Sequence, residues 1–196
     1  YDLKHVKREI LDILEKTRLA TESSAYQPAL WEPAGLAQAS QATSDNEYLA
    51  QWFASQALRE LLTYRDLIES YEDLDILRVI LSRSARSARL TTHFDLDFPK
   101  APQTEPYWCY KHGRMCAPTT SAYQFLKRYS LDTIRRLQEW AACRTNATVT
   151  VIHGDSRESD IPYIDGVITS PPYVGLIDYH EQHRYAYELM GLEDRR

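Results

Sequence analysis

Apolar residues recur at helical spacing in five stretches of the chain. In the first stretch, Leu3, Val6, Ile10, Ile13 and Leu14 share one side of a helical wheel, with charged residues between them. The same spacing predicts amphipathic helices in the following segments: residues 2–17, 44–70, 75–89, 119–143 and from 178 onward. Each helix should bury its apolar side, so we expect helix to dominate the structure.

Two of these helices are expected to begin at a capping sequence. Residues 44–47 read S-D-N-E, and Asp178 is followed three residues later by Glu181. In such a capping box the first side chain accepts a hydrogen bond from a free backbone N–H of the first helical turn. We therefore place helix starts close to Ser44 and Asp178.

Strand-like alternation replaces helical spacing near residue 150. Residues 149–155 read V-T-V-I-H-G-D, and Val167 and Ile168 form a short β-branched run. Both patterns are typical of strands. The second strand must stop before Pro171, because proline has no N–H to give to a sheet. The consecutive prolines then predict a stiff loop at the carboxyl end of a strand, where open α/β sheets bind ligands.

This loop, S-P-P-Y, offers groups suited to holding a planar base. Ser170 has a hydroxyl, Pro171 a backbone carbonyl and Tyr173 an aromatic face. In isolation the sequence is equally typical of a Pro-Pro turn with a packing tyrosine. Its context is more specific, because a strand, Gly154-Asp155, a short link and a second strand precede it. This order resembles the third and fourth motifs of the amino-methylating DNA methyltransferases, which methylate N4 of cytosine or N6 of adenine with S-adenosylmethionine.

The resemblance implies a role for each residue of the loop. Ser170 and the carbonyl of Pro171 would accept the two amino hydrogens of a base that is rotated out of the duplex. These hydrogen bonds would orient the nitrogen lone pair toward the methyl group and stabilise the charge that develops. Tyr173 would stack on the base, and Pro172 would shape the floor of the pocket.

The resemblance also implies a cofactor site, of which this chain carries one part. Gly154, Asp155 and Ser156 would lie near the adenine of S-adenosylmethionine, with Asp155 accepting its exocyclic N–H. The family's glycine-rich F-x-G-x-G turn is absent, because no two of the six glycines are within two residues of each other. We expect a second chain or a missing segment to carry that turn, and this chain alone to bind the cofactor poorly.

These observations predict an α/β fold: a fragment of a Rossmann-like methyltransferase with a large, mostly helical insertion. Residues 1–145 would form the helical insertion that recognises the DNA target, and residues 146–196 would belong to the catalytic domain. No internal repeat or low-complexity tract is found.

Charge narrows the expected DNA-binding surface to a local patch. The formal net charge is −5, so the surface as a whole does not favour nucleic acid. The predicted helix 75–89, however, has no acidic residue after Asp75, and it carries four arginines that are suited to a phosphate backbone: Arg78, Arg83, Arg86 and Arg89. The alternative is a solvated face whose arginines pair with acidic residues from elsewhere.

The three cysteines, an odd count, favour a reducing compartment over a disulfide framework, and the default location is cytoplasmic. Cys109, His112 and Cys116 have the spacing of an incomplete zinc site, with Cys143 or His93 as a fourth ligand. A second ligand pair of the C-x-x-C kind is missing, so the spacing is only weak evidence for zinc. We therefore expect buried cysteines and a loop histidine, with no metal.

The predicted function is therefore site-specific methylation of double-stranded DNA, in a restriction-modification setting. Serine rather than aspartate at position 170 favours N4 of cytosine over N6 of adenine. One alternative is an RNA base methyltransferase. A second, from another class, is a non-catalytic helical DNA-binding or assembly module in which S-P-P-Y is only a turn.

Overall fold

The computed structural model describes the chain over the following ranges: residues 2–25, 46–93, 99–152, 154–155, 157–161, 163–170 and 178–192. Its elements, in chain order, are α1 (Leu3–Ala25), α2 (Glu47–Trp52), α3 (Ser55–Ile68), α4 (Leu74–Ala88), β1 (Tyr107–Cys109), β2 (Arg114–Cys116), α5 (Tyr123–Cys143) and α6 (Tyr179–Met190). The expected dominance of helix is confirmed. No described helix has the length and apolar character needed to cross a membrane.

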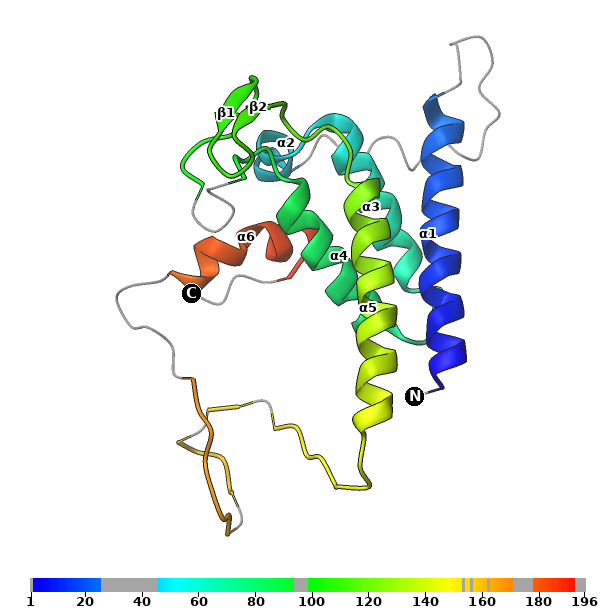
Figure 1. Cartoon of the computed structure of the whole chain (residues 1–196), viewed down its shortest axis with the longest axis vertical. Helices are drawn as coiled ribbons and strands as arrows, with labels where there is room; N and C mark the ends of the chain where they lie inside the picture. Colours follow the sequence, from blue (N-terminus) through cyan, green and yellow to red (C-terminus); the bar gives the residue numbers. More distant parts are fainter. Residues whose placement is uncertain are drawn as a thin grey trace.

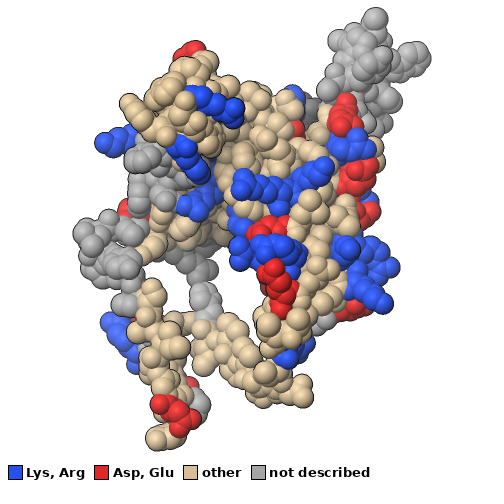
Figure 2. Space-filling model, viewed as in Figure 1, with Lys and Arg blue, Asp and Glu red and all other residues tan. Residues whose placement is uncertain are grey.

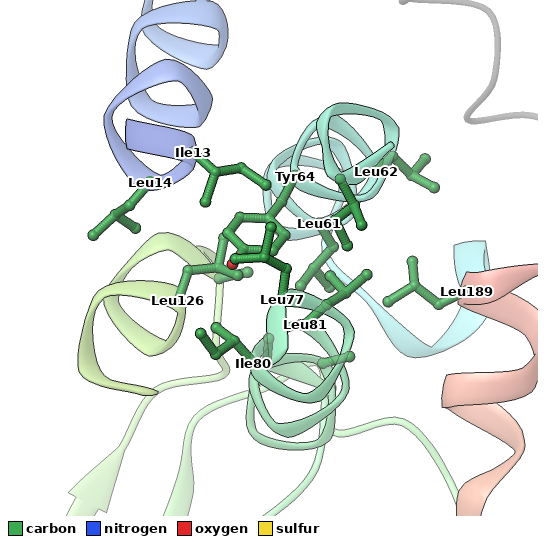
Figure 3. Close-up of a cluster of buried hydrophobic side chains, with 14 of the residues drawn as sticks. Ile13, Leu14, Leu61, Leu62, Tyr64, Leu77, Ile80, Leu81, Leu126 and Leu189 are labelled. Atoms are coloured by element: carbon green, nitrogen blue, oxygen red, sulfur yellow. The ribbon is translucent and has the colours of Figure 1, made fainter. Parts of the chain in front are cut away.

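The core lies between four helices. α1 packs against α3 and α5, α4 packs against the same two helices, and α6 packs against α2, α3 and α4 on the side away from α1 (Figure 1). Ile13, Tyr64, Leu77 and Leu126 meet at the centre, and Leu189 closes the side next to α6 (Figure 3). The apolar faces predicted for segments 2–17 and 75–89 are therefore confirmed. α6 belongs to the second predicted domain in sequence, yet it packs on the helices of the first.

The single helix predicted over residues 44–70 is wrong, because the structure breaks it in two. Phe53 and Ala54 adopt extended backbone between α2 and α3. The break buries the Phe53 side chain and lets the carbonyl of Trp52 accept the N–H of Leu90, 2.8 Å away. No proline or glycine marks this position, so tertiary packing overrides local helical preference there.

The start of α6 is confirmed, whereas that of α2 differs from the prediction. Asp178 accepts a hydrogen bond from the N–H of Glu181 at 2.9 Å. At α2 the capping residue is Asn46, whose side chain accepts from the N–H of Leu49 at 3.0 Å. Ser44 lies outside the described residues.

A buried carboxylate from a neighbouring helix caps α5. Ala122 stands at the N-cap of α5 and has no side chain to accept a hydrogen bond. Glu60 of α3, 4% exposed, accepts instead from the N–H groups of Ala122 at 2.6 Å and Tyr123 at 2.8 Å. The negative charge at a helix N-terminus is also favourable for the helix dipole. Glu60 thus joins α3 to α5.

A second carboxylate, that of Glu9 on α1, accepts hydrogen bonds from backbone N–H groups at the start of α4 and so joins these two helices. Its oxygens accept from the N–H groups of Glu72 and Asp73, both at 2.9 Å, just before α4 begins. Burial opposes ionisation of Glu9, but these two N–H donors and the nearby His5 outweigh burial and lower its pKa. The ionised form therefore stabilises the junction.

The two strands predicted at residues 149–155 and 167–168 are wrong for the described residues, which form no strand between Ala147 and Ser170. Val151 is 89% exposed, and Ile168 is fully exposed. Short β-branched strands need neighbouring strands to bury their side chains. The described residues provide only the antiparallel pair β1–β2, which lies on the far side of the helices (Figure 1). The Rossmann-like sheet stays a prediction.

Candidate functional site

The residues predicted for base binding lie in the stretch between α5 and α6. Ser170 is exposed. Pro171, Pro172 and Tyr173 lie outside the described residues, as does Ser156 of the predicted cofactor site. Gly154 and Asp155 are exposed in the same stretch. Their assigned roles stay predictions.

Asp155 is held by an arginine that sequence reasoning did not single out. The Arg157 guanidinium donates to both carboxylate oxygens of Asp155, at 2.5 to 3.1 Å, and the backbone N–H of Arg157 donates at 2.9 Å. These hydrogen bonds lower the pKa of Asp155, so its carboxylate is ionised at neutral pH. The D-x-R spacing was the available signal. The pair is exposed, and an exposed ion pair costs little to rearrange around a ligand.

The four arginines predicted as a DNA patch have different surroundings. Arg89 is 2% exposed, with its guanidinium carbon 4.5 Å from the centre of the Tyr185 ring. Burial lowers the pKa of its guanidinium. A phosphate does not reach Arg89 without rearrangement of α6. Arg86 is exposed at the end of α4.

The remaining two arginines are ion-paired, which corrects the expectation of an uncompensated cluster. Arg78 contacts Glu69 at 2.9 Å, and Arg83 contacts Asp132 of α5 at 2.7 Å. Arg83 also lies over the ring of Tyr129, 4.4 Å from its centre. Glu69 and Asp132 come from outside the sequence window of α4, so that window alone did not reveal them, whereas Asp75, 3.6 Å from Arg78, lies inside it.

Asp132 gathers three guanidinium groups on the surface between α4 and α5. Arg83, Arg135 and Arg136 donate to it at 2.7, 2.8 and 2.9 Å. Together they lower the pKa of Asp132 far below its usual range. Acidic and basic side chains accordingly alternate over this face instead of forming one positive area (Figure 2).

The cysteines and histidines near the β1–β2 hairpin converge. His93, Cys109, His112 and Cys116 each offer a ligand atom, and these atoms all lie within 4.8 Å of one another. Cys143 is exposed at the end of α5, away from this group. Of the two candidates for the fourth ligand, Cys143 and His93, the structure therefore places His93 in the cluster.

A comparison with curated proteins finds a similar sequence in the Type II methyltransferase M.MjaII of Methanocaldococcus jannaschii. The two are 42% identical over 167 residues, which cover 76% of this chain and 32% of the relative. The chain thus spans about a third of the relative's length. Residues 146–196 are only a quarter of the chain, so the similarity includes part of the helical region. No family model and no solved structure matches.

Proposed function

We propose that this chain is the S-P-P-Y-bearing part of an S-adenosylmethionine-dependent DNA methyltransferase, acting on the exocyclic amino group of a flipped base. N4 of cytosine is favoured over N6 of adenine. The similarity to a Type II methyltransferase over 76% of the chain carries the proposal. The S-P-P-Y motif at Ser170 supplies its chemistry.

The loop's task is to make a poor nucleophile reactive. An amino group conjugated to its ring has a delocalised lone pair. The hydroxyl of Ser170 and the carbonyl of Pro171 would accept its two N–H groups, which directs the lone pair out of the ring plane. As the nitrogen gains positive charge, both hydrogen bonds strengthen, so they stabilise the transition state more than the ground state.

The residues present fit one end of S-adenosylmethionine. When bound, this cofactor supplies a methyl group on a positively charged sulfur. The exposed, ionised carboxylate of Asp155 suits an adenine N–H. No pair of glycines in this chain is close enough to form the turn for the methionine end. We therefore propose that another segment or a second chain supplies that turn.

The exposed apolar side chains between α5 and α6 support this division of the site. Val149, Val151, Val167 and Ile168 are each more than 70% exposed. These four side chains lie within 20 residues of the chain, and apolar side chains that are exposed together usually mark a surface that another part of the protein covers. Neighbouring strands of a methyltransferase sheet would cover them and place Ser170 at the end of a strand.

Double-stranded DNA is the proposed partner, and the helical region would contact it. Arg86 on α4 is exposed, as are Lys111 and Arg114 on the β1–β2 hairpin. Such side chains contribute to affinity by neutralising phosphates, whereas sequence is read by other contacts. Arg78 and Arg83 are held by Glu69 and Asp132, and Arg89 is buried, so these three side chains would have to rearrange to reach a phosphate.

The test is methyl transfer by the chain joined to, or co-expressed with, a segment that carries the glycine-rich turn. Ser170→Ala should slow transfer of labelled methyl to DNA by about 10²- to 10³-fold, the usual cost of losing one group that stabilises developing charge. The matched control is Ser55→Ala, an exposed serine on α3, which should leave the rate unchanged.

Three outcomes would contradict the proposal. Equal rates for Ser170→Ala and wild type would remove the role of the motif. Methylation of RNA but not of DNA would favour the RNA base methyltransferase. DNA binding without methylation of either nucleic acid would favour a non-catalytic module.

A further inference from the structure

The hairpin β1–β2 holds two cysteines and two histidines in one cluster. The Nδ1 atom of His112 lies 3.5 Å from the Sγ of Cys109 and 3.4 Å from the Sγ of Cys116. The Nδ1 atom of His93 lies 3.5 Å from the Sγ of Cys109. The two imidazole rings meet edge to face with their centres 4.6 Å apart.

These distances agree with four ligands around one metal ion. Zinc binds thiolate sulfur at about 2.3 Å and imidazole nitrogen at about 2.0–2.1 Å, which at the tetrahedral angle separates sulfur from nitrogen by about 3.6 Å. The three sulfur–nitrogen contacts in the cluster are 3.4 to 3.5 Å. Two thiolates and two imidazoles form the soft S₂N₂ set that favours tetrahedral zinc.

Local structure holds each ligand in place. β1 and β2 pair Cys109 with Arg114 and Tyr107 with Cys116, so Cys109 stands at the turn between the strands and Cys116 lies two positions further from it on the same face of the hairpin. Gly113 closes that turn at a φ of +60°, where other residues are strained. The hydroxyl of Tyr107 accepts the backbone N–H of His93 at 3.0 Å, which ties the fourth ligand to β1. The same hydroxyl lies 2.9 Å from the ring Nδ1 of His93, a contact that a metal ion bound at Nδ1 would replace.

The hairpin also needs an additional source of stability. Its strands are three residues each, and Trp108, Tyr110 and Met115 are all more than half exposed. An isolated two-stranded hairpin of this kind is marginally stable in water. A metal ion held by its four ligands would supply the stability that apolar burial does not.

We propose that His93, Cys109, His112 and Cys116 form a structural zinc site that joins the end of α4 to the β1–β2 hairpin. All four coordination positions are filled by the protein, as in structural zinc sites, so no position is left open for a reacting water. This inference does not depend on the proposed methyltransferase activity.

Elemental analysis of the purified full chain tests the proposal. Chain expressed with zinc and purified without chelator should hold about one zinc ion per molecule. Cys109→Ser and Cys116→Ser should each lose it. Cys143→Ser, which removes the exposed cysteine at the end of α5, should retain it. Wild-type chain without metal, with iron in place of zinc, or with a Cys109–Cys116 disulfide would overturn the site.

A spectroscopic measurement on wild-type chain covers the case in which a cysteine variant does not fold. Cobalt substituted for zinc should give the intense visible bands of a tetrahedral ion, together with thiolate-to-cobalt charge transfer. The weak bands of octahedral cobalt, or no charge transfer, would overturn the proposed ligand set.

Tyr107 is a positioning residue in this proposal, and a conservative change tests it. Tyr107→Phe should weaken zinc binding about tenfold in competition with a chelator, because it releases the backbone of His93. Tyr110→Phe, an exposed tyrosine in the same hairpin, should leave the affinity unchanged. Equal affinities in the two variants would show that His93 is not held through Tyr107.

Discussion

Removing the Glu60 carboxylate should destabilise the chain more than any exposed charge does. Glu60 accepts four hydrogen bonds at its two oxygens, and the sources are the N–H groups of Ala122 and Tyr123, the hydroxyl of Ser121 and the side chain of Gln56. The N–H of Ala122 is buried with the carboxylate. Glu60→Ala leaves the buried N–H of Ala122 without an acceptor and leaves the N–H of Tyr123 only its 3.3 Å contact with the Ser121 hydroxyl. Glu60→Gln keeps the shape and one carbonyl oxygen.

The magnitude follows from the number of donors affected. An unsatisfied buried donor costs about 1–3 kcal/mol, and the charge at the start of α5 is worth up to about 1 kcal/mol, so Glu60→Ala should lower the free energy of unfolding by about 3 kcal/mol. Glu60→Gln loses the charge, which is favourable at the start of α5, and one of the two acceptor oxygens, and should cost about 1–2 kcal/mol. Both costs are large against a typical total stability of about 5–15 kcal/mol.

Urea unfolding of the full chain, followed by circular dichroism, measures these differences. With a slope of about 2 kcal/mol per molar urea, Glu60→Ala should move the midpoint down by roughly 1.5 M. The control is Glu139→Ala on α5, whose exposed ion pair with Arg135 should be worth less than about 0.5 kcal/mol. If Glu60→Ala and Glu139→Ala unfold at the same midpoint, the proposed capping of α5 is refuted.

Three further predictions follow from other contacts. The pKa of Glu9 is lowered in the folded chain, so its contribution to stability is present above the unfolded-state value of 4.5 and is lost as the pH falls through the folded value. Unfolding measured against pH should therefore show a weaker acid dependence in Glu9→Gln, and an unchanged profile would contradict this. Arg86→Ala should reduce the salt slope of DNA binding by about 0.9, whereas Arg89→Ala should lower the free energy of unfolding by about 2 kcal/mol. If Arg89→Ala changes the slope and Arg86→Ala does not, the assignment of the exposed arginine is wrong. Gly113→Ala should weaken zinc binding in a chelator titration, because it strains the turn by about 1–2 kcal/mol. Unchanged affinity would show that the turn does not position the cysteines.

The helices could be predicted from the sequence because each has one apolar face. Ile10, Ile80 and Leu126 are buried as their spacing predicts, and Asp178 caps α6. Trp140 has the helical spacing of the apolar face of α5, but it is 50% exposed. No residue of α5 after Ile134 is buried. The apolar spacing of this helix therefore continues past the point where other helices cover it.

Long-range contacts explain what sequence reasoning missed. The acceptor for the start of α5 is Glu60, 62 residues before Ala122, and the partner of Arg83 lies 49 residues away. Contacts between residues so far apart in the sequence cannot be inferred from a short stretch of it. His93 was one of two candidates for the fourth position of the cysteine–histidine cluster, and only the folding of the hairpin distinguishes it from Cys143.

The strands predicted at residues 149–155 and 167–168 need neighbouring strands, which the described residues do not provide. The alternation of apolar and polar residues at 149–155 indicates which side chains would be buried in a sheet. Their burial also requires neighbouring strands. Here Val151 and Ile168 face solvent. The base-binding role of the loop was accessible from sequence because it depends on the residues of one short motif.

Nucleoside analysis of methylated DNA tests the central proposal most directly. The chain, together with a segment that carries the glycine-rich turn, is incubated with S-adenosylmethionine and mixed-sequence DNA, which is then digested and analysed by mass spectrometry. The proposal predicts N4-methylcytosine with wild type and background levels with Ser170→Ala. Unmodified DNA with wild type, or a methyl group on carbon 5 of cytosine, would contradict it.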